Sequence, residues 1–459
     1  MTLVRRLLDR VFPRGALILS ILSLGYFAMG VIRNKALAST FGAGAELDAY
    51  NAAFKIPEIA LDVLVAGGLT APFVPIFNGL RLRNEAAAHD FARTLVTVAV
   101  LVMSVIVLLL FLIAPATVEL VASGFDAPTR ALYVDLFRIM CVTPVVFAAS
   151  IAIGEVLVAH QRFLFYALAP ILYTGGIATG TVLFGHRYGI YATAVGAVGG
   201  AVAHLVIRLI GLLRTPFRIR PRLAVRTPAF REFGRLMLPR MLSQPIDPLT
   251  LTFFTNLAAS IGVGAVSSFN FASDYQVVPV SLIGGSFSLA VFPTLAAAYA
   301  AGDATTFRRI LGRNVFTIGG LTILAAIALA ILAHPLVELL LGGGAFGPDD
   351  VDRTATVITA YALSIPLDSL SYPLSRGLYA THNTFLQVVA SIAGFVTILV
   401  VGSTLAGPLG IVAIPLAAAA GGVVKVGLLI VFLVPRLRRI GTAGPAIVAA
   451  ETANDPPEP

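Results

Sequence analysis

The sequence predicts an all-α polytopic membrane protein with about twelve transmembrane helices. We expect two parallel-repeat six-helix bundles with a cleft between them. Three observations lead to this prediction. Apolar stretches long enough to cross a bilayer follow one another along the whole chain. Arginines gather in every second link between these stretches. The second half of the chain repeats short motifs of the first half in the same order.

The composition excludes an ordinary soluble domain. Of the 459 residues, 58% are hydrophobic and 12% are charged, whereas soluble domains carry roughly 25% charged residues. A net charge of +9 would suggest nucleic acid in a soluble protein, but here the arginines lie in short links between apolar segments. We therefore expect the bilayer, and no nucleic acid, as a partner. The single cysteine, Cys141, allows neither a disulfide nor a cysteine-based metal site within the chain.

A membrane-spanning helix needs about 20 largely apolar residues, and this criterion predicts twelve spans. The first span follows a basic stretch, and no small-residue cleavage site follows it, so we expect a retained helix. Several spans are long enough to tilt or kink within the bilayer. In chain order the predicted spans are 15–38, 47–76, 94–115, 131–159, 163–184, 189–213, 236–258, 264–299, 315–334, 354–380, 384–405 and 409–434.

The arginines predict the orientation of the spans. If the N-terminal side is cytoplasmic, 21 arginines fall in cytoplasmic segments and three fall outside, namely Arg130, Arg187 and Arg353. We therefore expect a multi-pass protein of a cytoplasmic (inner) membrane with both termini in the cytoplasm. The expected parts are an N-terminal bundle, a basic cytoplasmic linker, a C-terminal bundle and a disordered tail, over residues 1–213, 214–235, 236–439 and 440–459.

The internal repeat predicts how the two halves are related. Matched features recur at offsets near 220 residues, among them Pro115 and Pro335, Pro144 and Pro366, and the diglycines 199–200 and 421–422. Six spans separate each matched pair, and an even number gives both halves the same orientation in the bilayer. Rocking of two such bundles about a cleft is a route to alternating access. A repeat kept for folding alone is the other interpretation.

Ionisable residues inside the predicted spans are the candidate site residues, because a charge at membrane depth usually faces a cavity or a partner. Lys55, Glu58 and Asp62 are spaced to share one helical face. Intra-protein ion pairing, or snorkelling near helix ends, is the other interpretation of such charges. The predicted substrate-binding residues are Arg33, Lys35, Lys55 and Arg240. The predicted gating or ion-coupling residues are Asp48, Glu58, Asp62, Asp247 and Asp274.

The motifs of soluble enzymes do not occur in the sequence. It contains no phosphate-binding Gly-Lys-Ser/Thr loop and no His-Glu-x-x-His, and its six histidines are scattered. We therefore predict a transporter and not an enzyme, with no catalytic residues, no cofactor and no metal site. Coupling to a monovalent cation, Na⁺ or H⁺, and transport driven by substrate consumption both remain open.

Residues 24–76 carry a resemblance to a known family. The matching runs are Gly30-Val31-Ile32-Arg33, Phe41-Gly42-Ala43-Gly44, Asp48-Ala49-Tyr50, Phe54-Lys55-Ile56-Pro57 and Phe73-Val74-Pro75. In order and spacing they resemble the MurJ/MviN family of lipid II flippases, part of the multidrug/oligosaccharidyl-lipid/polysaccharide exporter (MOP) superfamily. The resemblance implies a V-shaped pair of bundles around a cationic cavity. It also implies a polyprenyl-pyrophosphate-linked saccharide lipid as substrate and the cell-wall synthesis machinery as a partner.

Some residues of this chain match positions of the family, and others differ from it. Arg33 matches a cavity arginine of the family, and Asp48 and Lys55 match family positions in the second span. Phe27 stands where the family has another arginine, Leu61-Asp62 stands where it has an arginine pair, and Asp274 replaces a cavity arginine. The family also usually has fourteen helices, whereas twelve spans are predicted here.

We predict that the protein moves lipid II, a lipid-linked peptidoglycan precursor, across the cytoplasmic membrane by alternating access. Two alternatives remain open. One is a related polysaccharide-lipid flippase or cation-coupled small-molecule exporter, which the added acids Asp62 and Asp274 favour. The other is a membrane scaffold without transport activity, which the loss of family arginines favours.

Overall fold

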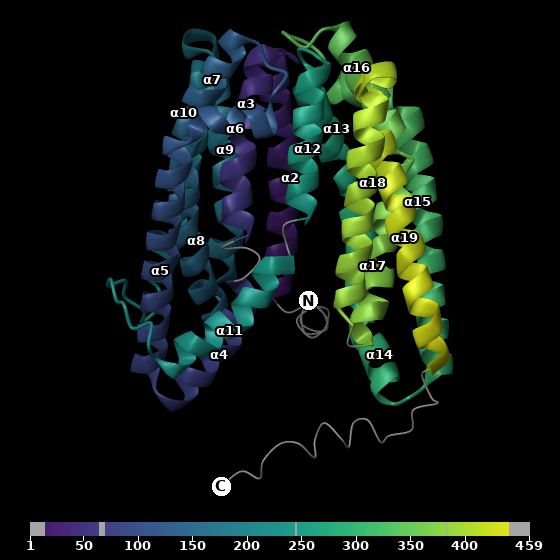
Figure 1. The fold of residues 1–459 in the computed structure, drawn as a ribbon. Coiled ribbons are helices and arrows are strands. Elements are labelled where there is room, and N and C mark those ends of the chain that lie inside the picture. Colours follow the sequence, from purple (N-terminus) through teal and green to yellow (C-terminus); the bar gives the residue numbers. More distant parts are fainter. Residues whose placement is uncertain (1–13, 64–68, 244–245, 382, 440–459) are drawn as a thin grey trace, which may run out of the picture. The chain divides into compact units, whose positions relative to one another are not determined.

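The computed structural model describes residues 14–63, 69–243, 246–381 and 383–439 (Figure 1). Its regular elements within these ranges are all helical, and the only β-type pairing found there is an isolated bridge between Gly343 and Phe346. The all-α prediction is therefore confirmed. The tail 440–459, which the sequence predicts to be disordered, lies outside the described residues.

The chain divides into two compact units, which we describe one at a time. The first unit comprises Met1–Ser267 and Glu338–Asp350, and the second comprises Ser268–Val337 and Val351–Pro459. Compactness defines these units, whereas the sequence repeat defines the predicted bundles. The predicted bundle boundaries therefore stay a prediction.

The first unit contains helices α2 to α12. Side-chain caps begin two of them, since Asn84 accepts a hydrogen bond from the Ala87 N–H (3.1 Å) and Asp126 accepts one from the Thr129 N–H (3.1 Å). The hydrogen bonds from Thr129 lower the pKa of Asp126. The helices are α2 (Arg14–Phe41), α3 (Ala45–Leu61), α4 (Thr70–Arg83), α5 (Glu85–Leu112), α6 (Ala114–Val121), α7 (Ala127–Met140), α8 (Val142–Ala159), α9 (Phe163–Tyr188), α10 (Ile190–Leu212), α11 (Pro228–Ser243) and α12 (Ile246–Ile261).

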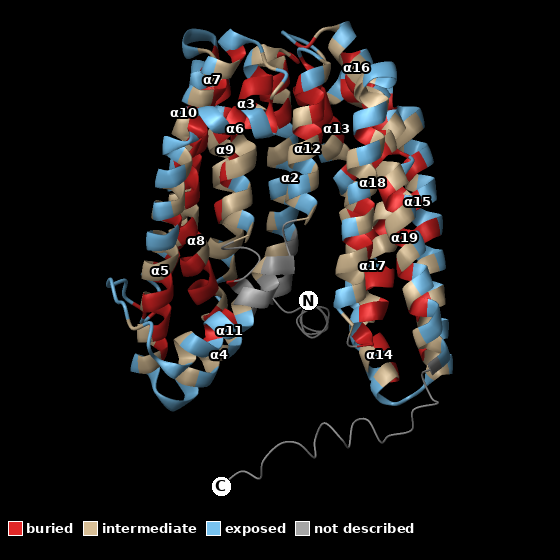
Figure 2. Cartoon of the chain, in the orientation of Figure 1, coloured by how far each residue is buried: buried red, intermediate tan, exposed pale blue. Residues whose placement is uncertain are grey.

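The core of the first unit is centred on α8, which is buried along much of its length (Figure 2). A stack of aromatic rings joins α4 to α5 beside it. The ring centroids of Phe73 and Phe77 are 5.3 Å apart, and those of Phe73 and Phe91 are 5.7 Å apart. Burial of such large rings makes this cluster a major source of stability in the unit.

The second unit begins within α13 and repeats the helix order of the first. Helices α17, α18 and α19 follow α8, α9 and α10 at the offset near 220 residues that the repeat predicts. The elements are α13 (Ala265–Pro279), the π-helix η2 (Val280–Gly285), α14 (Ser286–Ala300), α15 (Ala304–Leu340), α16 (Pro348–Tyr361), α17 (Ser364–Ala380), α18 (Phe385–Leu409), the 3₁₀ turn η3 (Gly410–Val412) and α19 (Ala413–Arg439).

Seven described helical stretches are long and apolar enough to cross a bilayer. One of them, Phe385–Arg438, combines α18 and α19, which the sequence predicts as two spans. The prediction of a polytopic membrane protein is therefore confirmed. Four predicted spans are not among the seven, namely 15–38, 47–76, 236–258 and 354–380.

Glycines let α9 and α10 approach each other closely. A Cβ atom added to Gly176 would lie 2.4 Å from the Cα of Gly200, and one added to Gly200 would lie 2.4 Å from the carbonyl oxygen of Tyr173. The corresponding pair in the second unit, α18 and α19, also meets at glycines, because a Cβ on Gly394 would lie 3.0 Å from the Gly421 oxygen. Small residues of this kind allow close helix packing in membranes.

We expect Gly200→Ala to destabilise the protein, because the new methyl group meets backbone atoms of α9 that cannot move aside. Overpacking of this kind typically costs about 1–3 kcal/mol. The neighbouring Gly199→Ala is the matched control, since a Cβ there has no atom within 4 Å. Thermal unfolding followed by far-UV circular dichroism measures both, and this signal suits a chain without tryptophan. Equal midpoints for the two variants would contradict the close packing.

Candidate functional site

Helices α2 and α3 carry most of the predicted site residues, and Gly42 makes the tight turn between them. Gly42 has a φ of 62°, a conformation that favours glycine, and a Cβ there would lie 2.5 Å from the carbonyl oxygen of Ala345. Helix α3 then begins with the acids Glu46 and Asp48 in its first turn, where negative charge is favourable. The family-like run therefore folds into a helical hairpin.

Arg33 lies on α2 within a group of polar side chains. Its guanidinium is partly buried and donates to the Oδ1 of Asn34 from Nε (3.0 Å) and Nη2 (2.8 Å). Tyr50 on α3 and Tyr173 on α9 lie within electrostatic range of Arg33 and Glu58. We call Arg33, Tyr50, Glu58 and Tyr173 the Arg33 cluster.

The sequence analysis does not predict the two tyrosines of the Arg33 cluster as site residues. Their hydroxyl oxygens are buried and make no hydrogen bond within the described part of the chain. A buried hydroxyl without a partner costs about 1–3 kcal/mol, so a hydrogen bond from a polar ligand to either hydroxyl would be favourable. Tyr50 lies within the family-like run, but Tyr173 carries no signal in the sequence, because α9 reaches α2 only through the fold.

Lys35 contacts the segment that follows α15. Its ammonium group donates to the carbonyl oxygen of Gly342. Two further bonds join the same regions, from the Ala345 N–H to the Ser39 oxygen (2.8 Å) and from the Ala43 N–H to a carboxylate oxygen of Asp350 (3.3 Å). Lys35 therefore has a structural contact, and its role in substrate binding stays a prediction.

Asp48 is buried and caps another helix. Its carboxylate accepts hydrogen bonds from the Gly264 N–H (2.6 Å), the Ser267 N–H (2.7 Å) and the Ser267 hydroxyl (2.6 Å). Helix α13 begins at Ala265, and Gly264 has no side chain to cap it. Asp48 thus supplies from α3 the acceptor that an N-cap residue would normally provide. Its predicted gating role remains a prediction.

The remaining acids and cations of the prediction are distributed over several helices. Lys55 and Glu58 lie on α3 and Asp62 directly follows its last residue; Lys55 is partly buried and the two acids are exposed. Asp247 is exposed in the first turn of α12, and Asp274 is exposed on α13. Arg240 belongs to α11, but its side chain lies outside the described residues, as do positions 244 and 245 that separate it from Asp247.

The second unit contains a polar contact at membrane depth that the sequence analysis did not select. The side-chain amide of Gln276 on α13 donates to Asp368 on α17 (2.8 Å) and to the hydroxyl of Ser364 (3.3 Å). Gln276 is buried, and the buried Tyr361 is within electrostatic range of Asp368. In the sequence, only Asp368 inside the predicted span 354–380 points to this contact. Nothing in the sequence indicates that its partner is Gln276 on another helix.

Two other features bear on what the protein could bind. An apolar groove of about 580 Å³ lies on α9 and α10 and is lined by none of the predicted site residues. Within the described ranges no three His, Cys, Asp or Glu side chains are grouped to hold a metal ion.

Two solved structures of known transporters have a fold similar to that of this chain. A structure described as "Lipid II flippase MurJ, inward closed conformation" matches with a TM-score of 0.78 at 20% identity, covering 96% of this chain and 94% of that chain. An inward-facing multidrug resistance MATE family transporter of the MOP superfamily matches with a TM-score of 0.75 at 13% identity, covering 91% and 96%. The chain therefore has the same fold as these two transporters.

The sequence comparisons are more specific. The family model "Lipid II flippase MurJ" matches residues 37–453. A probable lipid II flippase MurJ of Rickettsia prowazekii is 26% identical over 379 residues, which cover 81% of this chain and 74% of the relative. The lipid II flippase MurJ of Burkholderia cenocepacia is 28% identical over 366 residues, covering 77% and 70%. The chain belongs to the MurJ family, as the resemblance of residues 24–76 predicts.

Proposed function

We propose that the protein is a lipid II flippase, which moves this lipid-linked peptidoglycan precursor across the bacterial cytoplasmic membrane by alternating access. The observation that carries the proposal is the family match over residues 37–453. The MOP transporter fold and the Arg33 cluster support it. Peptidoglycan synthesis and cell shape would depend on this activity, and the enzymes of cell-wall synthesis are the partners we expect.

The chemistry of the Arg33 cluster suits a pyrophosphate-linked sugar. A guanidinium can donate two parallel hydrogen bonds to phosphate oxygens, and in a site of low dielectric this contact is strong. The hydroxyls of Tyr50 and Tyr173 can bind further phosphate or sugar oxygens. Lys35, Lys55 and Arg240 are the additional cations in this proposal. Glu58, Asp62, Asp247 and Asp274 are the acids proposed for gating, together with Asp48.

Rescue of a bacterial strain depleted of its own lipid II flippase tests this proposal. Expression of the full chain should restore growth and normal cell shape, and the purified protein should move lipid II across reconstituted vesicles. A protein that reaches the membrane at normal levels but neither rescues growth nor moves lipid II would contradict the proposal. The polysaccharide-lipid exporter and the scaffold would then become the leading alternatives.

Coupling to a monovalent cation forms a second part of the proposal, and Asp368 is the residue that the contacts favour. Gln276 donates to one carboxylate oxygen of Asp368 and to the Ser364 hydroxyl, and Tyr361 lies within electrostatic range of the carboxylate. Oxygen ligands of this kind suit Na⁺, and a carboxylate at membrane depth also suits H⁺. Movement of the cation through this site would bias the transport cycle.

We expect Asp368→Asn to remove the dependence of transport on the ion gradient, because the amide cannot release a proton or balance the charge of Na⁺. Transport into vesicles, measured with and without a Na⁺ or H⁺ gradient, should become gradient-independent and roughly tenfold slower. Asp352→Asn is the control, because this exposed acid pairs with His334 at 3.0 Å. An unchanged gradient response in Asp368→Asn would exclude Asp368 as the coupling residue.

We also propose that both termini and the linker 214–235 lie in the cytoplasm. The only cysteine, Cys141, is 1% exposed, so the natural chain offers little background for labelling. We expect Arg226→Cys to react with a membrane-impermeant maleimide only after cells are permeabilised. We expect Arg187→Cys, at the other end of the spans, to react in intact cells. The reverse pattern would overturn the orientation that the arginines predict.

A further inference from the structure

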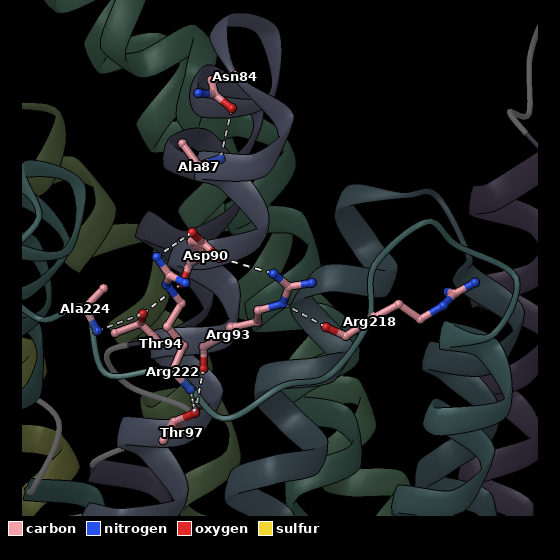
Figure 3. A network of polar contacts seen from close by, with 9 residues as sticks. All are labelled: Asn84, Ala87, Asp90, Arg93, Thr94, Thr97, Arg218, Arg222 and Ala224. Carbon is pink, nitrogen blue, oxygen red and sulfur yellow. Dashed lines mark hydrogen bonds and ion pairs between the residues drawn. The ribbon is translucent and has the colours of Figure 1, made fainter.

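The link between α10 and α11, residues 213–227, is held against α5 although it has no regular secondary structure. The Nε of Arg93 donates to the Arg218 oxygen (2.9 Å), and the Arg222 N–H donates to the Thr97 hydroxyl (3.1 Å). Asp90 pairs with the side chain of Arg222 at 2.9 Å (Figure 3). Five polar residues thus fix the path of this link, which we call the basic strap.

An apolar groove of about 270 Å³ lies where the basic strap meets the end of α10. Its walls come from the last turns of α10 and from the strap, and Arg218 lies at the same groove. The wall residues Ile210, Leu213 and Ile219 are exposed, Leu213 by as much as 74%. Because α10 is a candidate span, its end lies where acyl chains meet lipid head groups. The remaining wall residues are Val206, Leu209, Leu212 and Phe217.

The charge around this groove is positive. The basic strap contains five arginines and no acid. Asp90, which lies next to it on α5, is already shared by Arg93 (3.1 Å) and Arg222 (2.9 Å). One end of the Arg218 guanidinium donates to the backbone oxygens of Thr215 (2.7 Å) and Phe217 (3.0 Å), and Figure 3 shows its side chain extending away from Asp90. Arg220 is exposed and makes no polar contact within the described part of the chain.

We propose that this groove binds an anionic glycerophospholipid of the leaflet that faces the basic strap. One acyl chain lies along Ile210, Leu213 and Ile219, and the phosphate group contacts Arg218 and Arg220. The positive-inside pattern alone would need arginines in the link, but it would need neither a link bound to α5 nor an apolar groove beside Arg218. The inference does not depend on the proposed transport function, because none of these residues belongs to the Arg33 cluster.

Lipid binding to the purified full-length protein tests this inference. Native mass spectrometry gives the affinity of the tightest lipid-binding step for dioleoylphosphatidylglycerol and for dioleoylphosphatidylcholine, which differ only in the head group. We expect the anionic lipid to bind more tightly to the natural chain. Arg218→Gln and Arg220→Gln should each weaken it about fivefold, and the double variant about thirtyfold, since an arginine near an anionic surface contributes about 1 kcal/mol. Binding of the zwitterionic lipid should change little.

Two further variants separate the contributions of the head group and the acyl chain. Ile210→Trp fills the groove and should weaken binding of both lipids, while Arg187→Gln, an exposed arginine at the end of α9, should change neither. Arg218→Gln removes hydrogen bonds that hold the basic strap and could change its structure. In that case the lipid affinity of Arg220→Gln alone tests the inference, because the Arg220 side chain makes no contact that holds the strap. Equal affinity of the natural chain for the two lipids would overturn the inference. Full binding in the double variant, or full competition by inorganic phosphate with no effect of Ile210→Trp, would also overturn it.

Discussion

Arg33→Ala is expected to abolish rescue of a flippase-depleted strain and to slow lipid II movement in vesicles by about 10- to 100-fold. The range corresponds to the loss of one hydrogen-bonded contact to a charged group, about 1.5–3 kcal/mol. Arg33 belongs to the Arg33 cluster, in which the buried Tyr50 and Tyr173 hydroxyls make no hydrogen bond within the described ranges. Arg33→Lys keeps the charge but loses the planar fork, so we expect an intermediate rate.

The control for Arg33 is Arg187→Ala. Arg187 is exposed in the last turn of α9 and stacks on the ring of Tyr188 at 5.2 Å, so its removal takes one positive charge from the same unit without touching the cluster. We expect normal transport in this variant. Normal transport in Arg33→Ala, at equal protein levels, would show that Arg33 does not bind the substrate.

Asp48→Ala is expected to lower the stability of the folded protein by about 3 kcal/mol, the size expected when charge-assisted hydrogen bonds are lost in a buried place. The substitution leaves the N–H groups of Gly264 and Ser267 and the hydroxyl of Ser267 without their acceptor at the start of α13. Asp48→Asn keeps one acceptor oxygen but turns an NH₂ group toward an N–H donor, so a smaller loss is expected. The midpoint of thermal unfolding by circular dichroism measures both.

A suitable control for Asp48 is Asp349→Ala. Asp349 is also an acid in the first turn of a helix, α16, but it is exposed, and such a residue contributes only about 0.3–1 kcal/mol. If the Asp48 and Asp349 variants unfold at the same temperature, the carboxylate of Asp48 does not hold α13. If Asp48→Ala keeps its stability but loses transport, a role in gating would replace the structural one.

Some charged residues of the candidate site were predictable, because a charge inside an apolar segment is visible in the neighbouring sequence. Arg33, Asp48 and Lys55 stand out as charged residues inside apolar segments, and the run around them marks the family. The Asp368 carboxylate carries the same local signal. The partners of these residues were not predictable. Asp48 contacts residues 216 and 219 positions away, and Lys35 contacts one 307 positions away.

The sequence by itself determined that the chain is helical, spans a membrane several times and belongs to the MurJ family. Each of these properties depends on runs of neighbouring residues, whose hydropathy, charge and spacing can be read without a fold. Only the tertiary structure decided that Asp48 caps α13, that Tyr50 and Tyr173 lie within electrostatic range of Arg33, and that Asp90 holds the basic strap. The reason is that a hydrogen bond or an ion pair requires two groups within about 3 Å, and helix packing alone brings distant parts of the chain that close.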